Sequence, residues 1–255
     1  MRKVIVITGA SGGIGAALAR ELGEAGHQLV LAARRQQELE ELARESGEGA
    51  IAVPTDVTRR EEVERLRDRA LEVHGRIDVW INNAGRGISK RVMELTDADF
   101  DEMMTVNVKS ALYGMQAVVP HFQQRGSGHL INVSSFLGRV PLVPIRSAYN
   151  AAKAALNALT ANLRVDLKAE HPGIQVSLVM PGVVTTEFAR NALGSSTGSS
   201  YRPPASAAQP QTAEEVAAAI ARLIEHPQAE IFTNPAQIPI ARRYYEDIAA
   251  FEAQV

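Results

Sequence analysis

The chain has 255 residues, of which 45% are hydrophobic and 22% are charged, with 27 basic side chains against 29 acidic ones. This near-neutral balance argues against a protein that binds nucleic acid or an anionic membrane by bulk charge. No cysteine is present, which excludes disulfide scaffolds, thiol nucleophiles, iron–sulfur clusters and cysteine-type zinc sites.

Short β-branched runs alternate with segments of helical length along most of the chain. The predicted strands are Val4–Ile7, Gln28–Ala33, Ala50–Val53, Val79–Asn82, His129–Ser134, Gln175–Met180 and a weaker Glu230–Thr233. The predicted helices are Gly13–Ala25, Gln36–Glu45, Arg60–Val73, Asp99–Gln124, Ala148–Glu170 and Ala213–Glu225. Strands rich in Val and Ile on both faces, separated by helices, are typical of a parallel sheet covered on both sides. We therefore predict one doubly wound α/β domain over residues 1–255.

Two segments lie outside this alternation. Residues 187–211 contain a Gly-, Ser- and Pro-rich tract, which is too polar to pack as core and predicts either a mobile lid over the substrate or plain disorder. Residues 236–255 form a C-terminal tail in which Ile240–Asp247 reads as part of an amphipathic helix. That helix covers the substrate mouth, contacts another subunit or is solvated.

The N-terminus does not fit a secretion signal. Arg2 and Lys3 are followed by only four apolar residues, Val4–Ile7, whereas the apolar region of a signal peptide has ~7–15. No run approaches the ~18 apolar residues of a membrane span. We expect a cytoplasmic protein without a membrane or nucleic-acid partner.

A glycine-rich turn joins the first predicted strand to the first helix. In Thr8–Gly15 the candidate cofactor-binding residues are Gly9, Ser11, Gly12, Gly13, Ile14 and Gly15. Glycine allows a tight turn and a close approach of the backbone to a pyrophosphate at the helix N-terminus. A plain turn would explain one or two glycines, but four favour nucleotide binding. The phosphate-loop pattern of ATPases is absent.

The end of the second strand indicates which nucleotide. Arg34, followed by Arg35, lies 19 residues after Gly15, where NAD-binding proteins carry an acid and NADP-binding proteins a nearby arginine for the 2′-phosphate. The alternative is two solvated arginines that pair with Glu38 or Glu41. Asp56 and Val57, after the third strand, are candidates for contacts to the adenine.

A tyrosine and a lysine lie four residues apart in a segment of helical composition, at Tyr149 and Lys153. Residues at this spacing share a helix face. A positive charge about 4 Å away supplies ~4 kcal/mol at an effective dielectric of 20, enough to bring a phenol from a pKa of about 10 to about 7. Alone, the pair usually describes an exposed helix face.

Joined to the glycine turn, these motifs resemble the short-chain dehydrogenase/reductase family in its single-domain branch of about 250 residues. In order they are Thr8–Gly15, Asn82–Gly85, Asn107, Ser134–Ser135, Tyr149 with Lys153, and Pro181–Gly182, so that the resemblance covers residues 3–186. It implies a three-layer Rossmann fold with strand order 3-2-1-4-5-6-7. It also implies hydride transfer between a nicotinamide cofactor and a carbonyl compound or alcohol.

The resemblance also implies a role for each matched residue. Tyr149 would be the general acid or base, Lys153 would lower its pKa and hold the nicotinamide ribose, Ser135 would bind the substrate oxygen, and Asn107 would position a water. Asn83, Ala84 and Gly85 would support the cofactor, and Pro181, Gly182, Val183 and Thr185 would line the nicotinamide carboxamide. Ser135 precedes Tyr149 by 14 residues, one more than usual in the family, so Ser134 is the alternative hydroxyl.

We predict NADP(H) as the preferred cofactor, with NAD(H) possible because many NADP-binding members carry a basic residue where Gly12 stands. No metal site is predicted. The long segments Asp99–Gln124 and Ala148–Glu170 imply a homodimer or homotetramer by resemblance. The runner-up function is a non-catalytic, nucleotide-binding regulatory protein of the same fold, and Gly194–Gly198 matches a hydrolase motif only formally.

Overall fold

The computed structural model describes residues 2–188, 191–194 and 209–254. One seven-stranded sheet has the order β3-β2-β1-β4-β5-β6-β7, and all its neighbouring strands are parallel. This confirms the predicted fold class and strand order. The strands are β1 (Val4–Thr8), β2 (Gln28–Ala33), β3 (Ala50–Pro54), β4 (Val79–Asn82), β5 (Gly128–Val133), β6 (Ile174–Met180) and β7 (Glu230–Phe232).

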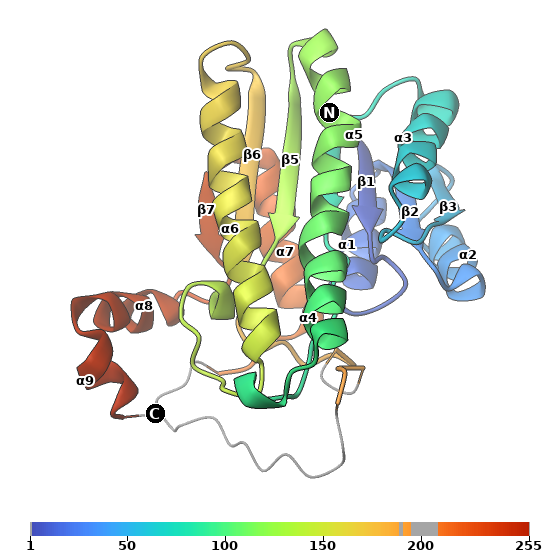
Figure 1. Cartoon of the computed structure of the whole chain (residues 1–255). Coiled ribbons are helices and arrows are strands. Elements are labelled where there is room, and N and C mark those ends of the chain that lie inside the picture. The colour runs from blue at the N-terminus through green and yellow to red at the C-terminus, as the bar shows by residue number, and fades with distance from the viewer. Residues whose placement is uncertain (1, 189–190, 195–208, 255) are drawn as a thin grey trace.

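Helices cover both faces of the sheet (Figure 1). The α-helices are α1 (Gly13–Glu24), α2 (Gln36–Glu45), α3 (Arg60–His74), α4 (Asp97–Met104), α5 (Ser110–Arg125), α6 (Ser147–Lys168), α7 (Ala213–Glu225), α8 (Gln237–Glu246) and α9 (Ile248–Glu252). Two short 3-10 helices, η1 (Val92–Glu94) and η3 (Phe136–Gly138), lie before α4 and α6. A π-helical segment, η2 (Thr105–Lys109), lies between α4 and α5.

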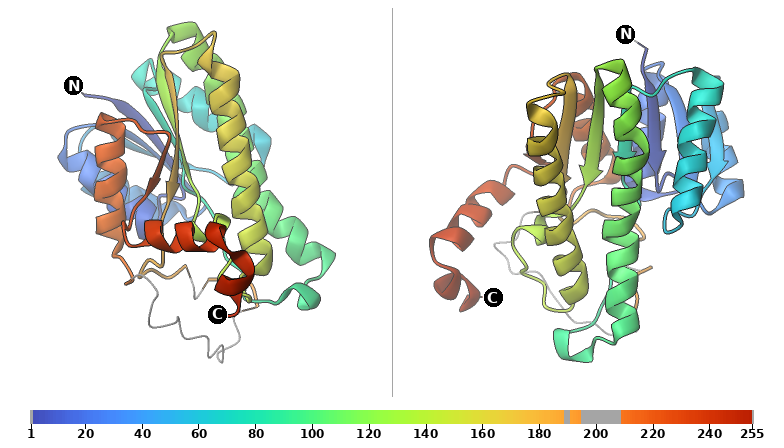
Figure 2. Two further views of the ribbon diagram at one scale, coloured as in Figure 1. Left: turned by 90° about the vertical axis from the view of Figure 1, so that its left-hand side faces the viewer. Right: turned by 45° about the horizontal axis from the view of Figure 1, so that its top comes forward.

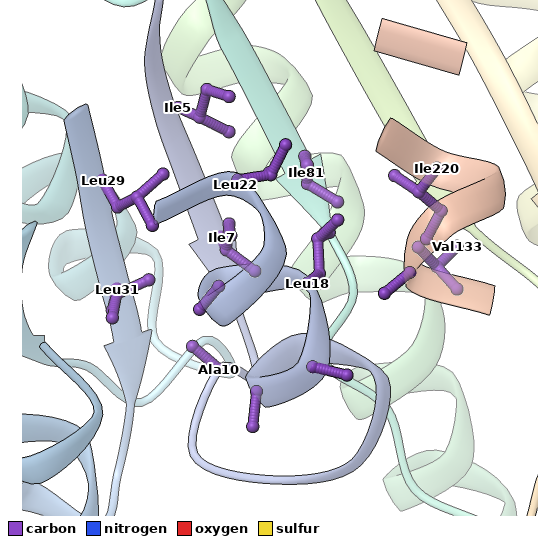
Figure 3. Close-up of a cluster of buried hydrophobic side chains, with 14 of the residues drawn as sticks. Ile5, Ile7, Ala10, Leu18, Leu22, Leu29, Leu31, Ile81, Val133 and Ile220 are labelled. Carbon is purple, nitrogen blue, oxygen red and sulfur yellow. The ribbon is translucent and has the colours of Figure 1, made fainter. Parts of the chain in front are cut away.

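The core forms two apolar layers because alternate residues of each strand face opposite sides. Ile5 and Ile7 of β1 pack with α1, α2 and α7, while Val6 packs with α3, α5 and α6. Figure 3 shows the layer that contains Ile5 and Ile7, in which Leu18 and Leu22 of α1 pack with the strand residues. Fully burying an isoleucine or leucine contributes about 1.5–3 kcal/mol, so the sheet is fixed from both sides.

The predicted single helix over Asp99–Gln124 was wrong in one respect. Thr96 caps α4, which begins two residues before the predicted start, and the π-helical segment η2 separates α4 from α5. A π-helical turn inserts an extra residue and is frequent at functional sites; here it contains Asn107. Hydrophobic periodicity does not report such an insertion.

The structure describes the C-terminal tail but only part of the predicted lid. The predicted helix in the tail is confirmed as α8, and α9 follows it. Both helices lie beyond β7, at the end of the sheet to which the strand arrows point (Figures 1 and 2). Most of the predicted lid, residues 189–190 and 195–208, lies outside the described residues. Within the described ranges, no helix has the length and apolar character needed to cross a bilayer.

Candidate active site

A cavity of about 1220 Å³ runs along the carboxyl ends of the strands, where open α/β sheets bind their ligands. It extends from the glycine turn and the end of β2 to α8 and α9. Most predicted site residues line it: Gly9, Ser11, Gly12, Gly13, Ile14, Arg34, Arg35, Asp56, Val57, Asn83, Ala84, Gly85, Ser135, Tyr149, Lys153, Pro181, Gly182 and Val183. Gly15, Asn107 and Thr185 lie outside the lining.

The glycine turn fits a pyrophosphate because it keeps side chains away from the backbone. Gly9 has a φ of 67°, and a Cβ there would lie 2.7 Å from Ala84 Cα. A Cβ on Gly15 would lie 2.4 Å from the Gly9 carbonyl oxygen, so Gly15 acts inside the turn. Gly12 is the N-cap of α1, and no side chain caps the helix. The first N–H groups of α1 therefore face the cavity with the partial positive charge that an anion prefers.

Thr8 and Asn83 attach this turn to β4. The Thr8 hydroxyl accepts hydrogen bonds from the backbone N–H of Asn83 at 3.0 Å and of Ala84 at 3.2 Å. In return, Asn83 Nδ2 donates to the carbonyl oxygens of Thr8 at 3.0 Å and Gly9 at 3.2 Å. Sequence reasoning missed Thr8 as a supporting residue, although a threonine that ends the strand before a glycine turn is a usable signal.

The two arginines after β2 have different environments. The Arg35 guanidinium donates to the Ser11 carbonyl oxygen at 2.7 Å and pairs with Glu38 at 3.4 Å. The Arg34 side chain makes no hydrogen bond or ion pair with another described residue. Partial burial opposes ionisation of Asp56, but hydrogen bonds from Thr58 and the charge of Arg34 outweigh it, so the pKa of Asp56 is lowered.

Tyr149, Ser135 and Lys153 meet at the centre of the cavity. Tyr149 and Lys153 share a face of α6, as their spacing predicts, with Lys153 Nζ 5.7 Å from the centre of the Tyr149 ring. Lys153 Nζ donates to the Val133 carbonyl oxygen at the end of β5, at 2.9 Å. The Ser135 hydroxyl, just past β5, lies close enough to the Tyr149 side chain to lower its pKa.

The pKa of Tyr149 is raised, not lowered as expected. Burial raises the pKa of Tyr149 to about 12, against smaller lowering effects of Ser135 and Arg146. Burial also lowers the pKa of Lys153 to about 8. The estimate from spacing counted the attraction between the two charges but omitted the cost of removing each from water. Both groups are therefore driven toward their neutral forms.

The hydrogen-bond partners of Ser134 and Ser135 distinguish the two candidate hydroxyls. Ser134 Oγ donates to Asn157 Oδ1 at 2.5 Å and lies 3.3 Å from the Lys153 carbonyl oxygen, which ties it to α6. Ser135 Oγ accepts from the Leu137 N–H at 3.1 Å and keeps its contact with Tyr149. This geometry favours Ser135.

Asn107 lies behind the cavity wall. Its Oδ1 accepts from the Arg86 N–H at 3.1 Å, and its Nδ2 donates to the carbonyl oxygens of Arg86 and Met103, both at 3.0 Å. A Cβ on Gly85 would lie 2.9 Å from Asn107 Oδ1 and 3.6 Å from Lys153 Nζ. Asn107 is thus close to the site but separated from the cavity by Gly85.

The structure differs from the prediction at Thr185. Thr185 is exposed, and its N–H donates to the Gln211 carbonyl oxygen at 2.9 Å. The next residue, Thr186, lines the cavity instead, beside Gly13. The chain bends here to form a bridge between Val184 and Gln211, which the local sequence does not reveal.

Several residues that line the cavity were not predicted. Gln237, at the start of α8, is 2% exposed, and its Oε1 has no hydrogen-bond partner among the described residues. Arg146 precedes Tyr149 by one helical turn, and Arg243 and Phe251 come from the C-terminal helices. Phe136, Leu137, Leu142 and Phe188 give the cavity an apolar wall, and Val140 is buried in the same cluster as Phe136.

Comparisons with known proteins agree with this geometry. A family model described as short chain dehydrogenase matches residues 3–195. The uncharacterized oxidoreductase YxnA of Bacillus subtilis is 37% identical over 237 residues, which cover 90% of this chain and 65% of YxnA. The chain thus spans just under two thirds of that relative.

Two solved structures share the whole architecture. A short chain dehydrogenase/reductase of Burkholderia phymatum, in complex with NAD, is 29% identical with a TM-score of 0.86, over 98% of this chain and 95% of that one. An alcohol dehydrogenase of Thermococcus sibiricus, complexed with 5-hydroxy-NADP, is 30% identical with a TM-score of 0.78, over 91% and 96%. The sheet order and the site define an oxidoreductase with a Rossmann-type fold. The chain belongs to the short-chain dehydrogenase/reductase family.

Proposed function

We propose that the protein is an NADP(H)-dependent oxidoreductase that interconverts a carbonyl compound and its secondary alcohol. The observation that carries this proposal is the meeting of Ser135, Tyr149 and Lys153 in the cavity that also contains the glycine turn. A nucleotide that extends from the turn along the strand ends would bring its nicotinamide beside Tyr149. The bound nicotinamide supplies the hydride to the carbonyl carbon, or accepts it from the alcohol.

The protein's own side chains handle the oxygen and the proton. The Ser135 hydroxyl and the Tyr149 phenol bind the carbonyl oxygen, and Tyr149 donates its proton to that oxygen as the alcohol forms. In the reverse direction the Tyr149 phenolate accepts the proton of the alcohol. Lys153, when protonated, stabilises the phenolate and holds the ribose hydroxyls of the cofactor. Asn107 would support this site from behind Gly85, because its side chain is already bonded to Arg86 and Met103.

Replacement of the phenol tests this assignment. The variant Tyr149→Phe keeps the ring that packs edge-on against Phe188 at 5.5 Å but loses the proton donor. We expect carbonyl reduction to fall by about 100-fold or more, while nucleotide binding, followed by fluorescence, changes little. Unchanged turnover would overturn the role of Tyr149. Nucleotide binding without turnover of any ketone, aldehyde or alcohol would favour the regulatory alternative.

The preference for NADP(H) rests on Arg34. Its guanidinium lines the cavity at the end of β2 and has no ion pair or hydrogen bond within the described ranges, so its donors are available to a 2′-phosphate. Arg35 is already bonded to Ser11 and supports the turn. One of the solved relatives contains an NADP derivative and the other NAD, so the family alone does not decide.

We expect kcat/KM for NADPH to exceed that for NADH by about 10-fold or more, since a charge-assisted hydrogen bond contributes roughly 1.5–3 kcal/mol. The variant Arg34→Asp should reverse the preference. Arg44→Asp, an equal charge change on the exposed side of α2, should leave the ratio of the two values unchanged. Equal use of both cofactors by the unmodified protein would contradict the proposal.

We also propose a homodimer or homotetramer that assembles through α5 and α6. These helices cover the same face of the sheet (Figure 1). Val165 of α6 is 71% exposed on this face. Burial of this apolar side chain against a second subunit would be favourable. We expect a second copy of the helix pair to pack against it.

A further inference from the structure

We propose that the substrate is an oxo acid whose carboxylate is bound by Arg146 while its carbonyl oxygen is bound by Ser135 and Tyr149. This inference rests on the proposed function and specifies the substrate class of the same site. It is carried by an arginine that the reaction chemistry does not use and by the surroundings of that arginine.

Arg146 is the N-cap residue of α6 and lines the cavity. Because it precedes Tyr149 by three residues, their side chains project from the same side of the helix, with Cβ atoms ~5–6 Å apart. Charge interaction between Arg146 and Tyr149 affects the pKa of each. A ligand that touches the phenol with its carbonyl oxygen therefore has its next few atoms within reach of the guanidinium.

The Arg146 guanidinium is only partly satisfied by the protein. Nη1 donates to the Ile88 carbonyl oxygen at 2.9 Å, and the side chain makes no other hydrogen bond or ion pair within the described part of the chain. A guanidinium has five N–H donors. Phe188, Leu142 and Val143 line the same cavity as Arg146, and an unpaired charge away from water is costly. Burial accordingly lowers the pKa of Arg146.

The acidic groups at this end of the cavity do not neutralise Arg146. Glu102 is paired with Arg86, and no carboxylate is among the groups that shift the pKa of Arg146. A second cation, Arg243 of α8, lines the same cavity and lies over the Phe251 ring at 5.6 Å. The field at this mouth therefore favours an anion.

The shape of the free group favours a carboxylate. A guanidinium binds a carboxylate through two parallel N–H bonds, and one edge of Arg146 remains for this after the bond to Ile88. The short separation from Tyr149 favours an acid group a few bonds from the carbonyl carbon. The apolar walls then hold the carbon chain between the two polar ends.

The test compares each oxo acid with its own methyl ester, which removes the charge and keeps the carbonyl. The probes are pyruvate, acetoacetate and levulinate with their methyl esters, each at saturating reduced cofactor. For the preferred chain length we expect kcat/KM for the acid to exceed that for the ester by about 10-fold or more. The variant Arg146→Gln, which keeps an amide donor for the Ile88 carbonyl, should lower the value for the acid by about 10–100-fold and that for the ester by less than about 3-fold. Arg146→Lys should recover part of the loss, mainly through KM.

Two controls separate this inference from the proposed function. Arg44→Gln, on α2 and outside the cavity, should change kcat/KM for neither the acid nor the ester. Reduction of the esters with no preference for the acids, or an equal loss for both in Arg146→Gln, would overturn the oxo-acid assignment and leave the oxidoreductase function intact. If no compound were reduced, calorimetric titration with levulinate and its methyl ester would still decide. Binding of the acid that is lost in Arg146→Gln supports the assignment, and equal binding of the two compounds refutes it.

Discussion

The buried ammonium of Lys153 makes the stability of the protein depend on pH in a defined window. Burial lowers its pKa from an ordinary value of 10.5 to about 8 in the folded chain. Between these two values the unfolded chain binds more protons than the folded chain, so stability rises with pH by about 1.36 kcal/mol per unit. From pH 7 to pH 9.5 the gain assigned to Lys153 is about 2 kcal/mol. The same gain is lost as pH falls through 8.

The variant Lys153→Met removes this titration while keeping an unbranched side chain of similar length. Urea unfolding of both proteins, without cofactor and at half-unit steps from pH 7 to 9.5, gives the difference in their unfolding free energies. We expect that difference to shift in favour of the unmodified protein by about 2 kcal/mol across the window. Titration of Tyr149, whose pKa is about 12, is present in both proteins and cancels.

Lys168→Met provides the matched control, because Lys168 is an exposed lysine of the same helix. Its unfolding free energies should run parallel to those of the unmodified protein at every pH. If the Lys153→Met series also ran parallel, the ammonium would lie in a water-like environment and the desolvation argument would be refuted. A slope of the opposite sign would mean that the folded protein holds the proton more tightly than the unfolded chain does.

Other parts of the molecule give independent tests. Gly15→Ala places a Cβ 2.4 Å from the Gly9 carbonyl oxygen and should raise the Kd for NADPH by more than about 10-fold in a fluorescence titration. Gly26→Ala is the control, because Gly26 has a φ of 80° and a Cβ there would meet nothing within 4 Å. It should lower the free energy of urea unfolding by about 1 kcal/mol without changing that Kd. Burial lowers the pKa of His129 to about 4, so His129 should account for a loss of about 3 kcal/mol of stability as pH falls from 6.5 to 4. The stability of His129→Gln should fall by about that much less than that of the unmodified chain over the same range. Val165→Arg should reduce the mass measured by light scattering if α6 forms the proposed interface, and an unchanged mass would exclude that residue from it.

Most of the fold was predictable because strands buried on both faces leave a strong signal. The Val and Ile content of β1 and β4 marks them as central strands, and the intervening amphipathic segments leave helices as the only covers for the sheet. The π-helical turn at η2 was not predictable, since an inserted residue changes the phase of a helix without changing its composition. Cap residues such as Thr96 shifted boundaries by one or two positions, as local hydrogen bonds and not periodicity decide where a helix begins.

The candidate site was predictable where chemistry is encoded in order and spacing. Gly9, Ser135, Tyr149 and Lys153 meet because the carboxyl ends of parallel strands share one edge. Arg146 was missed because an arginine is ordinary on a helix surface. Only the folded structure shows that it lines the cavity. Proximity alone was an insufficient basis for the electrostatics, because attraction between two charges and the cost of burying them are of similar size.

The opposing pKa shifts of Tyr149 and Lys153 define what the ligand must change. A pKa of about 12 keeps the Tyr149 phenol protonated, which suits the proton donor that we propose for carbonyl reduction. Oxidation needs the phenolate, and therefore a charged neighbour that offsets the cost of burial. Lys153 has a pKa of about 8 and donates to the Val133 carbonyl oxygen, so it is poised to take up that charge once an anionic nucleotide enters the cavity. The phosphates of the cofactor would raise the pKa of Lys153, and the resulting ammonium would lower that of Tyr149. Under the proposed function, cofactor binding would prepare the acid–base pair as well as supply the hydride.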